Sequence, residues 1–316
     1  MEVIRDLVNL RPRHRGCVAT IGNFDGVHVG HQAILSALRR QALEHELPAV
    51  VITFEPTPRE FFAPESCPPR LTGFREKVDM LESHGVDRLL LLRFDQRLAS
   101  LPASEFIERI LVKGLGVRHL LIGDDFRFGQ GREGDFAMLR AAGERQGFGV
   151  DSTPTQTLDD ERVSSTRVRA ALATGELAEA ERLLGRKYRI SGRVAHGDKL
   201  GRTIGFPTAN LRRRQERLPL TGVFLVRCYG LASQPVYGAA NVGTRPTVDG
   251  KKNLVEVHLF DFERDIYGQH IEVEFLEKLR DEKKFADVDA LKEQIQQDVN
   301  DARLRQTEWQ KREQAI

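Results

Sequence analysis

The sequence has little cysteine, a single tryptophan and no long apolar run. Its three cysteines, Cys17, Cys67 and Cys228, form no CxxC pair and no even-numbered framework. This spacing excludes a small disulfide-stapled secreted domain and indicates free thiols in a reducing compartment. Apolar runs such as 49–52 are far shorter than the roughly 20 residues that cross a bilayer, and residues 1–15 lack the apolar centre of a secretory signal. We therefore expect a cytoplasmic protein with no membrane partner.

The sequence also has no large excess of basic or acidic residues. Lys and Arg total 48 and Asp and Glu total 46, a formal net charge of +2, which is far from the basic balance of a nucleic-acid-binding protein. We expect no nucleic-acid partner. The run Arg212-Arg213-Arg214 is more typical of a solvated loop than of a phosphate-binding patch. With 40% hydrophobic residues in 316, the chain is expected to form a globular protein of about two domains.

In the first half, short apolar runs alternate with helical patterns. This rhythm predicts an α/β domain with a Rossmann-like parallel sheet, right-handed crossovers and helices on both faces. Ligands bind such sheets at the carboxyl ends of the strands. The predicted strands are 17–21, 49–54, 88–94 and 119–122, and the predicted helices are 32–45, 75–84, 105–111 and 137–146.

The second half changes character after a helical stretch at 177–184. Short β-type runs separated by turn residues predict an antiparallel β-barrel. Leu291, Ile295 and Val299 recur at four-residue steps and predict a terminal amphipathic helix. We therefore predict an α/β domain over 1–184 and a β-barrel domain over 185–316. The predicted barrel strands are 188–194, 223–229, 236–242, 254–260 and 271–276.

The segment 22–31 follows the first predicted strand and opens the first predicted helix. Its glycines permit a tight turn, and a helix N-terminus offers free N–H donors, which together suit a polyphosphate. His28 and His31 lie three residues apart on one helical face and could donate hydrogen bonds to phosphate oxygens that gain charge. There are two alternative interpretations of this pair. The histidines could belong to an ordinary helix surface, or they could be two ligands of a metal site for which no third ligand is apparent.

Two further segments stand at comparable positions. Segment 123–129 follows the fourth predicted strand and offers a carboxylate, an aromatic ring and a guanidinium. Segment 164–169 brings hydroxyls and arginines to a helix start, where they would suit the β- and γ-phosphates of a nucleotide. For each segment, a helix cap or a solvated loop is the alternative interpretation.

The barrel half contains a glycine-rich segment, 192–210, that matches neither a Walker loop nor a dinucleotide fingerprint. Its backbone could still donate N–H groups to phosphates, although a turn between strands is the simpler interpretation. Thr208 and Asn210 offer hard oxygen ligands of the kind that Mg²⁺ uses. Glu256 shares a strand face with His258 and Phe260 and could act as a general base, or it could be a solvated strand glutamate.

In this order, the motifs closely resemble the bacterial bifunctional riboflavin kinase/FAD synthetase family over nearly the whole chain. His-x-Gly-His at 28–31 resembles the wider nucleotidyltransferase superfamily, whereas Gly-Phe-Pro-Thr-Ala-Asn at 205–210 is highly specific. The sequence departs from the family pattern at Thr57, where histidine is usual, and at Phe224, where tyrosine is common.

The resemblance implies a nucleotidyltransferase fold and FMN adenylyltransferase activity for the first half, and riboflavin kinase activity for the second. It also implies ATP, riboflavin and FMN as partners, flavins as substrates and products, and Mg²⁺ bound with ATP. Self-association is left open. For the adenylyltransferase it implies ATP binding by Gly22, Asn23, Phe24, Asp25, Gly26, His28, His31, Ser164, Thr166 and Arg167, and flavin binding by Asp125, Phe126 and Arg127. For the kinase it implies ATP binding by Gly192, His196, Gly197, Lys199, Gly201, Gly205, Pro207, Thr208 and Asn210, metal binding by Thr208 and Asn210, flavin binding by Arg280 and Phe285, and catalysis by Glu256.

Two reactions are expected from this resemblance. The kinase would transfer the γ-phosphate of ATP to riboflavin, and the adenylyltransferase would transfer the nucleotidyl group of a second ATP to FMN with release of pyrophosphate. One rival is an adenylyltransferase for another phosphate acceptor, such as phosphopantetheine or nicotinamide mononucleotide. Another is a non-catalytic flavin- or nucleotide-binding regulator that contacts RNA through 212–214.

Overall fold

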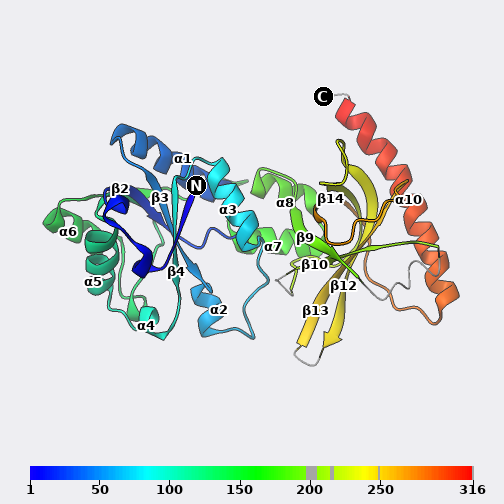
Figure 1. Cartoon of the computed structure of the whole chain (residues 1–316), viewed down its shortest axis with the longest axis horizontal. Coiled ribbons are helices and arrows are strands. Elements are labelled where there is room, and N and C mark those ends of the chain that lie inside the picture. The colour runs from blue at the N-terminus through cyan, green and yellow to red at the C-terminus, as the bar shows by residue number, and fades with distance from the viewer. Residues whose placement is uncertain (197–204, 214–216, 248–249, 315–316) are drawn as a thin grey trace. The chain divides into compact units, whose positions relative to one another are not determined.

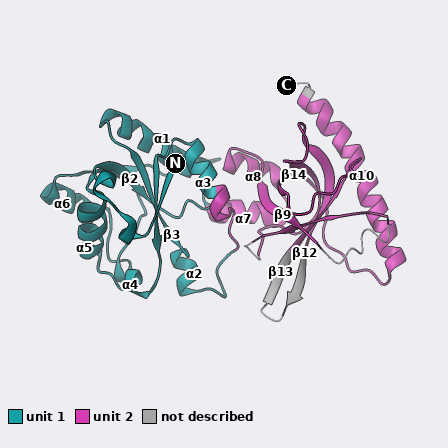
Figure 2. Ribbon diagram, viewed as in Figure 1, with its two compact units in different colours: residues 1–68, 77–164 teal, residues 69–76, 165–316 magenta. Residues whose placement is uncertain are grey.

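The chain forms two compact units in a computed structural model that describes residues 1–196, 205–213, 217–247 and 250–314 (Figures 1 and 2). The first unit comprises 1–68 and 77–164, and the second comprises 69–76 and 165–316. Segment 69–76 thus belongs to the second unit, although the residues directly before and after it in the sequence belong to the first. Glu76 explains this membership in part, because its Oε1 accepts hydrogen bonds from the backbone N (2.7 Å) and Oγ (2.9 Å) of Ser191.

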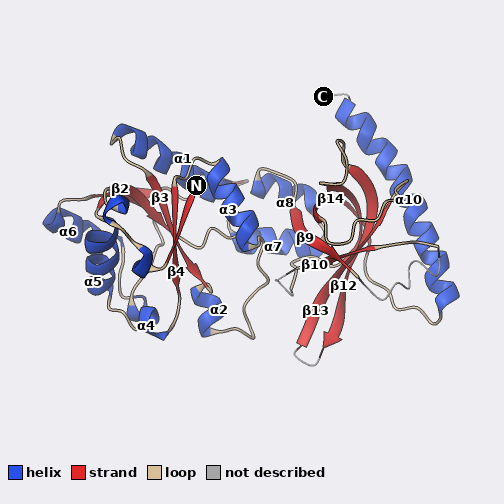
Figure 3. Ribbon diagram, in the orientation of Figure 1, coloured by secondary structure: helices blue, strands red, loops and turns tan. Residues whose placement is uncertain are grey.

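The first unit is built on a six-stranded sheet of order β1-β4-β3-β2-β5-β6, in which every neighbouring pair is parallel (Figure 3). The predicted parallel sheet is confirmed. The predicted pattern omitted the two edge strands β1 and β6, since β1 has one buried side chain and β6 carries exposed polar residues instead of an apolar run. The strands are β1 (Glu2–Arg5), β2 (Cys17–Ile21), β3 (Ala49–Glu55), β4 (Arg88–Arg93), β5 (Val117–Gly123) and β6 (Gly149–Thr153).

Helices cover both faces of this sheet, so its central strands β2 and β3 are buried on both sides. Cys17, Ala19 and Ile21 of β2 pack with the helical residues of 103–115 and α6 in one cluster, whereas α1 packs against β2, β3 and β5 outside that cluster. The helices are α1 (Val29–Glu44), α2 (Pro58–Phe62), α3 (Phe74–Ser83), α4 (Gln96–Ala99), α5 (Ala103–Phe106) continued by a π-helix (Ile107–Leu115), and α6 (Phe136–Gln146); β7 (Thr157–Leu158) and β8 (Glu161–Arg162) form a small hairpin.

The second unit is a closed antiparallel barrel of order β10-β13-β12-β11-β14-β9, preceded by two helices and followed by one (Figure 3). The predicted barrel and terminal helix are confirmed. Strand β10 was not predicted, because its four residues directly follow the glycine- and proline-containing loop. The elements are α7 (Ser165–Thr174), α8 (Leu177–Leu184), β9 (Arg189–Ala195), β10 (Ala209–Arg212), β11 (Gly222–Tyr229), β12 (Val236–Thr247), β13 (Gly250–Leu259), β14 (His270–Arg280) and α10 (Val288–Gln314).

Helix α10 packs on the outside of the barrel through one apolar stripe. Ile295 and Val299 belong to a cluster with Leu276 and Phe260, as the four-residue periodicity predicts. Ion pairs add to this packing, since Arg303 of α10 donates to both carboxylate oxygens of Asp261, at 2.9 and 2.8 Å. Within the described ranges, no helix is both long and apolar enough to cross a membrane.

The two residues that depart from the expected family pattern both have defined local contacts. Thr57 is the N-cap of α2: its hydroxyl accepts from the backbone N of Glu60 (3.4 Å), while Glu60 Oε2 accepts from the backbone N of Thr57 (2.8 Å). This reciprocal capping box satisfies two backbone donors at the helix start. Phe224 is fully buried in the barrel and packs edge-on against Phe275, with ring centroids 5.2 Å apart.

A buried carboxylate holds three strands of the barrel together. Glu274 of β14 is 1% exposed, and its oxygens lie 2.6 Å from Arg189 Nη2 of β9 and 2.6 Å from Arg227 Nη2 of β11. The hydroxyl of Tyr229 donates to the same carboxylate at 3.3 Å. Burial, and then the Glu274 charge, raise the pKa of Tyr229, which keeps this donor protonated.

Replacement of this carboxylate should destabilise the barrel. Glu274→Gln leaves two arginines facing a neutral, mostly buried group, so we expect the free energy of unfolding of the second unit to fall by roughly 3 kcal/mol. Glu272→Gln on the same strand removes a half-exposed partner 3.5 Å from Arg189 and should cost less than about 1 kcal/mol. Urea unfolding followed by fluorescence of Trp309, the single tryptophan, measures both. Equal effects of the two variants would contradict the assignment.

Candidate functional sites

The first site lies where the strand order of the parallel sheet reverses. Strand β2 pairs with β3 on one side and with β5 on the other, so the carboxyl ends of β2 and β5 stand at a topological switch point. Open α/β sheets bind their ligands at this place. Segment 22–31 follows β2 and segment 123–129 overlaps the end of β5, so the structure brings two of the predicted segments to the same edge.

The loop after β2 is held in an unusual backbone conformation by its buried side chains. Phe24 and Val27 have φ angles of +48° and +40°, which residues other than glycine rarely adopt. Both side chains are buried in the core, at 1% and 0% exposure, and this burial offsets the strain. Gly26 has a φ of +85° at no steric cost, and Asn23 is exposed. The loop therefore has a defined shape ahead of α1.

The predicted histidine pair is assembled at the start of α1. His28 is the N-cap residue, and its Nδ1 accepts a hydrogen bond from the backbone N of His31 at 3.3 Å. The two imidazole rings stack with centroids 3.7 Å apart and an interplanar angle of 15°. A side chain at Gly30 would lie 3.2 Å from the His28 ring, which explains the glycine between the histidines. Spacing and glycine together place two imidazoles at one helix N-terminus.

His31 is held neutral by its surroundings. Burial, then the neighbouring His28 and Lys77, keep the pKa of His31 well below its usual value. Lys77 is itself 1% exposed and belongs to the same unit. His31 Nδ1 is buried and has no hydrogen-bond partner among the described residues. A neutral imidazole of this kind can donate one hydrogen bond to an incoming anion.

The residues predicted after β5 already have partners within the first unit. Asp125 pairs with Arg162 at 2.6 Å, and Arg127 with Asp135, the N-cap of α6, at 3.2 Å. Phe126 lies half-buried and stacks on a neighbouring phenylalanine ring with centroids 5.6 Å apart. Carboxylate, ring and guanidinium therefore occur together at the strand end, as predicted.

The predicted phosphate clamp is divided between the two units. Ser164 is the last residue of the first unit, whereas Thr166 and Arg167 lie in α7 of the second. Within the second unit, Arg167 donates to Glu179 at 2.6 Å. The clamp remains a prediction. Among the described residues, no group of three His, Cys, Asp or Glu side chains is arranged to hold a metal ion.

The second site is a row of polar side chains across three strands of the barrel. Asn210 of β10 lies directly opposite Glu256 of β13, and Glu256 lies directly opposite Asn241 of β12. Directly paired residues point to the same face of a sheet. Their neighbours Val255 and Val257 are buried on the opposite face, which lines the barrel interior. The row therefore lies on the outer face, and Asn241 was absent from the predicted site.

The loop before β10 packs against this outer face. The ring of His258, two residues along β13 from Glu256, has its Nδ1 3.0 Å from the carbonyl oxygen of Pro207. Phe206 packs edge-on against the same ring, with centroids 5.6 Å apart. Thr208 follows this loop and is half-buried, one residue before β10. The structure thus brings Thr208, Asn210 and Glu256 to one region of the barrel.

The structure describes some of the remaining residues that were predicted to bind ATP in the kinase, and each has a different local environment. Gly192 is buried in β9, where a side chain would lie 3.1 Å from the carbonyl oxygen of Arg212, so strand packing by itself accounts for this glycine. Gly205 has a φ of +92° that favours glycine. His196 stacks with Tyr267 at a centroid distance of 3.8 Å. Predicted residues Gly197, Lys199 and Gly201 lie outside the described residues.

Of the two residues predicted to bind the flavin in the kinase, Arg280 ends β14 and Phe285 follows five residues later. Arg280 makes a bidentate pair with Asp298 of α10, at 2.7 and 2.6 Å. Its guanidinium also stands 5.9 Å from the ring centroid of Phe285. The terminal helix therefore orients the predicted flavin arginine.

The arginine run is not the solvated loop that its composition predicts. The Arg213 side chain is only 6% exposed and lies 3.7 Å from Glu76 Oε1, because segment 69–76 packs within this unit. The prediction is wrong for Arg213. Arg212 is exposed, as predicted, but it belongs to strand β10 and not to a loop. Arg214 lies outside the described residues.

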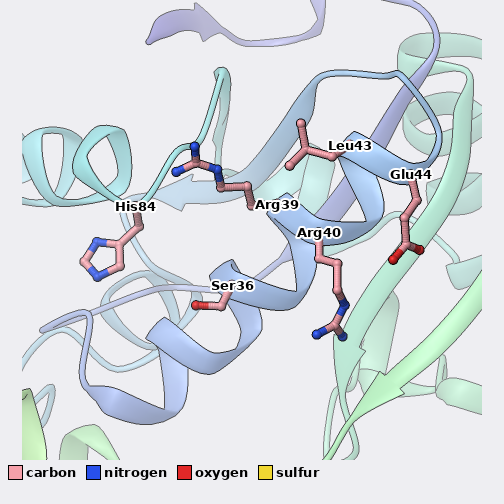
Figure 4. Close-up of a pocket in the computed structure, with 6 residues that line it drawn as sticks. All are labelled: Ser36, Arg39, Arg40, Leu43, Glu44 and His84. Atoms are coloured by element: carbon pink, nitrogen blue, oxygen red, sulfur yellow. The ribbon is translucent and has the colours of Figure 1, made fainter.

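A surface hollow elsewhere contains none of the predicted residues. Figure 4 shows its lining residues, which come from α1 except for His84, the residue that directly follows α3. It is lined by Ser36, Arg39, Arg40, Leu43, Glu44 and His84.

Comparison with known families matches both parts of the chain. The family described as FAD synthetase matches residues 10–167, and the family described as riboflavin kinase matches residues 184–305. The bifunctional riboflavin kinase/FMN adenylyltransferase of Pseudomonas fluorescens is 56% identical to this chain, covering 96% of it and 97% of the relative. This chain belongs to the bifunctional riboflavin kinase/FMN adenylyltransferase family.

Other relatives agree over the same length. The bifunctional riboflavin kinase/FMN adenylyltransferase of Escherichia coli K12 is 52% identical over 96% of this chain and 97% of its own. A crystal structure of a protein from Streptococcus pneumoniae, described as a macrolide-efflux protein, has a TM-score of 0.80 and 33% identity over 94% of this chain and 97% of that one. The histidine pair thus lies in the FAD synthetase part of the bifunctional enzyme, and the polar row in its riboflavin kinase part.

The buried neutral His31 should make the stability of this riboflavin kinase/FMN adenylyltransferase depend on pH. Unfolding restores its usual pKa of 6.5, so below this pH the unfolded chain binds a proton that the folded chain does not. The contribution is fully present above about pH 6.5 and is lost as pH falls toward the folded value. We expect the free energy of unfolding to fall more steeply in the wild type than in His31→Asn, by up to about 1.4 kcal/mol per pH unit. Urea unfolding at about pH 7.5, 6 and 5 measures the two slopes, and identical slopes would refute the buried neutral state.

Proposed function

We propose that residues 1–184 carry the FMN adenylyltransferase reaction around His28 and His31, and that residues 185–316 carry the riboflavin kinase reaction around Glu256. The observation that supports this proposal most directly is that the histidine pair belongs to the first unit and Glu256 to the second. The histidine stack stands at a strand switch point, and Glu256 stands opposite Asn210 on the barrel wall. The chain would thus make FMN from riboflavin and then FAD from FMN, with ATP as the co-substrate of both steps.

In the proposed kinase step, Glu256 accepts the proton of the terminal ribityl hydroxyl of riboflavin. The hydroxyl oxygen forms a bond to the γ-phosphorus of ATP, the bond between that phosphorus and the β-phosphate oxygen breaks, and ADP leaves. Oxygen atoms of Thr208 and Asn210 would hold the Mg²⁺ that arrives with ATP, and this ion neutralises phosphate charge. The fit is chemical, since a hydroxyl and an amide oxygen two residues apart, the second opposite a carboxylate, are hard ligands.

Other residues would position the two kinase substrates. The glycine-rich segment would bind the phosphates through Gly192, His196, Gly197, Lys199, Gly201, Gly205 and Pro207. Arg280, oriented by Asp298, would lie with Phe285 beside the flavin. Positioning supplies much of the rate of such transfers.

Removal of the proposed base should affect one activity only. Glu256→Gln keeps the shape of the side chain but cannot accept the hydroxyl proton, so we expect kcat for FMN formation to fall roughly 10²- to 10⁴-fold. Formation of FAD from supplied FMN should remain. Chromatographic separation of riboflavin, FMN and FAD over time measures both rates, with the exposed Glu263→Gln as the matched control. Near-normal FMN formation by Glu256→Gln would reject the base assignment.

In the proposed adenylyltransferase step, a phosphate oxygen of FMN attacks the α-phosphorus of ATP. The bond to the β-phosphate oxygen breaks, so the products are FAD and pyrophosphate. His28 and His31 would donate hydrogen bonds to oxygens that gain charge in the transition state. The nucleotide would be bound by the loop of Gly22, Asn23, Phe24, Asp25 and Gly26, the leaving phosphates by Ser164, Thr166 and Arg167, and the flavin by Asp125, Phe126 and Arg127.

Loss of either imidazole should reduce FAD formation without preventing FMN formation. For His28→Ala and for His31→Ala we expect the rate of FAD formation to fall roughly 10²- to 10³-fold, the effect of removing one transition-state donor. FMN should accumulate from riboflavin at the wild-type rate. His84→Ala, on the rim of the hollow outside the proposed site, is the control and should keep both activities. Unchanged FAD formation in the two histidine variants would refute their role.

We further propose a cytoplasmic location, without a nucleic-acid or membrane partner. The free cysteines Cys17, Cys67 and Cys228 suit a reducing compartment. Burial raises the pKa of the Cys17 and Cys228 thiols to about 12, so these two are unreactive packing groups.

A further inference from the structure

Helix α10 supplies a buried carboxylate to the proposed flavin arginine. Asp298 is 6% exposed and directly precedes Val299, which packs on the barrel. Its Oδ1 and Oδ2 accept hydrogen bonds from Arg280 Nε at 2.7 Å and from Arg280 Nη2 at 2.6 Å. Two parallel bonds of this kind fix both the position and the plane of a guanidinium. The orientation of Arg280 is therefore set by a residue of the terminal helix.

The carboxylate of Asp298 is itself held by a second residue of α10. Gln294, one helical turn earlier, donates from Nε2 to Asp298 Oδ1 at 3.0 Å. Residues four apart are neighbours on a helix surface, so this bond forms within α10. Ile295 and Val299 belong to one apolar cluster with the barrel, so the helical turn that carries both polar side chains is anchored. A chain of hydrogen bonds thus runs from Gln294 through Asp298 to Arg280.

These contacts leave a defined part of the guanidinium for a ligand. A guanidinium has five N–H donors. Asp298 accepts from two of them, and Nη1 of Arg280 donates a third to the carbonyl oxygen of Asp281 at 2.8 Å. Arg280 makes no other hydrogen bond with the residues that the structure describes, so one N–H remains on each of Nη1 and Nη2.

The surroundings of these two donors suit an uncharged aromatic ligand. The ring centroid of Phe285 lies 5.9 Å from the guanidinium carbon of Arg280. Asp298 balances the positive charge of Arg280, so the pair is better matched to a neutral ring system than to a phosphate. The ring of riboflavin is flat and carries carbonyl oxygens along one edge, and these oxygens can accept from two donors held in one plane.

We infer that Asp298 is a positioning residue for the riboflavin kinase reaction: held by Gln294, it fixes the guanidinium of Arg280 so that the two remaining N–H donors face the carbonyl edge of the flavin ring. This inference rests on the proposed flavin role of Arg280. A side chain that is fixed before the ligand arrives loses little rotamer freedom on binding, which favours affinity. The affinity for riboflavin, and not the transfer of phosphate, should therefore depend on Asp298.

The test is riboflavin binding and FMN formation by the full chain. Asp298→Asn can no longer accept from both Arg280 donors, so we expect the Kd for riboflavin, measured by quenching of flavin fluorescence, and the KM for riboflavin to rise about fivefold to tenfold. The KM for ATP should change by less than about twofold and kcat by less than about threefold, because Asp298 acts on flavin binding alone.

Two milder variants test the same geometry. Arg280→Lys keeps the charge but lacks the planar fork, so its riboflavin Kd should rise as much as that of Asp298→Asn. Gln294→Ala removes only the donor that holds Asp298, and a rise of about twofold to threefold is expected. A lysine variant that binds riboflavin as the wild type does would overturn the role of the fixed plane.

A matched control separates positioning from simple anchoring of the helix. Arg303→Gln breaks another bidentate pair of α10, the one with Asp261 at 2.9 and 2.8 Å, and does not touch Arg280. It should leave the Kd and KM for riboflavin unchanged. Thermal melting and FAD formation from supplied FMN report on folding in every variant. Equal riboflavin KM values for Asp298→Asn and Arg303→Gln would show that Asp298 only anchors the helix, and would overturn the inference.

The premise is tested separately with Arg280→Ala. This variant should raise the Kd for riboflavin at least as much as Asp298→Asn, and adding Asp298→Asn to it should weaken binding no further, because Asp298 acts through Arg280. Unchanged riboflavin binding by Arg280→Ala rejects the proposed flavin role of this arginine, and the inference with it. Weaker binding by Arg280→Ala, with wild-type binding by both Asp298→Asn and Gln294→Ala, overturns the positioning role alone.

Discussion

Backbone hydrogen bonds between neighbouring strands set where every proposed catalytic side chain of this enzyme stands. In the first unit, pairing of β2 with β3 and β5 creates the switch point that the histidine loop occupies. In the second, the register of β13 with β10 and β12 places Glu256 between two asparagines. A shift of one residue in that register would turn Glu256 into the barrel interior, because successive strand residues face opposite sides.

Two ionisable groups withdrawn from solvent differ in the partners that surround them. His31 is held neutral, since burial and two neighbouring bases disfavour its protonated form. Glu274 is 1% exposed and is paired with Arg189 and Arg227. The neutral imidazole is suited to donate to a substrate anion, whereas the paired carboxylate ties strands together. The partners of a buried group, more than burial itself, thus distinguish a proposed catalytic residue from a structural one.

Much of the fold could be predicted from local patterns. The central strands, α6 and α8 carry apolar runs or stripes that identify them within a few residues. The stripe of Leu291, Ile295 and Val299 indicates that α10 exists but not where this helix ends. Edge strands β1 and β6 and the short β10 could not, because their pairing partners, and not their own residues, make them strands. Membership of segment 69–76 in the second unit depends likewise on remote contacts such as Glu76 with Ser191.

By itself, the sequence determined which residue types stand at each turn and helix start: the two histidines around Gly30, the oxygen ligands of 208–210 and the glutamate of β13. These are signals between near neighbours in the chain, and they suffice to indicate the family. Only the tertiary structure decided that His31 is buried and neutral, that Arg213 is enclosed beside Glu76, and that Asn241 faces Glu256. These outcomes depend on strand register and packing between distant segments, which no local pattern specifies.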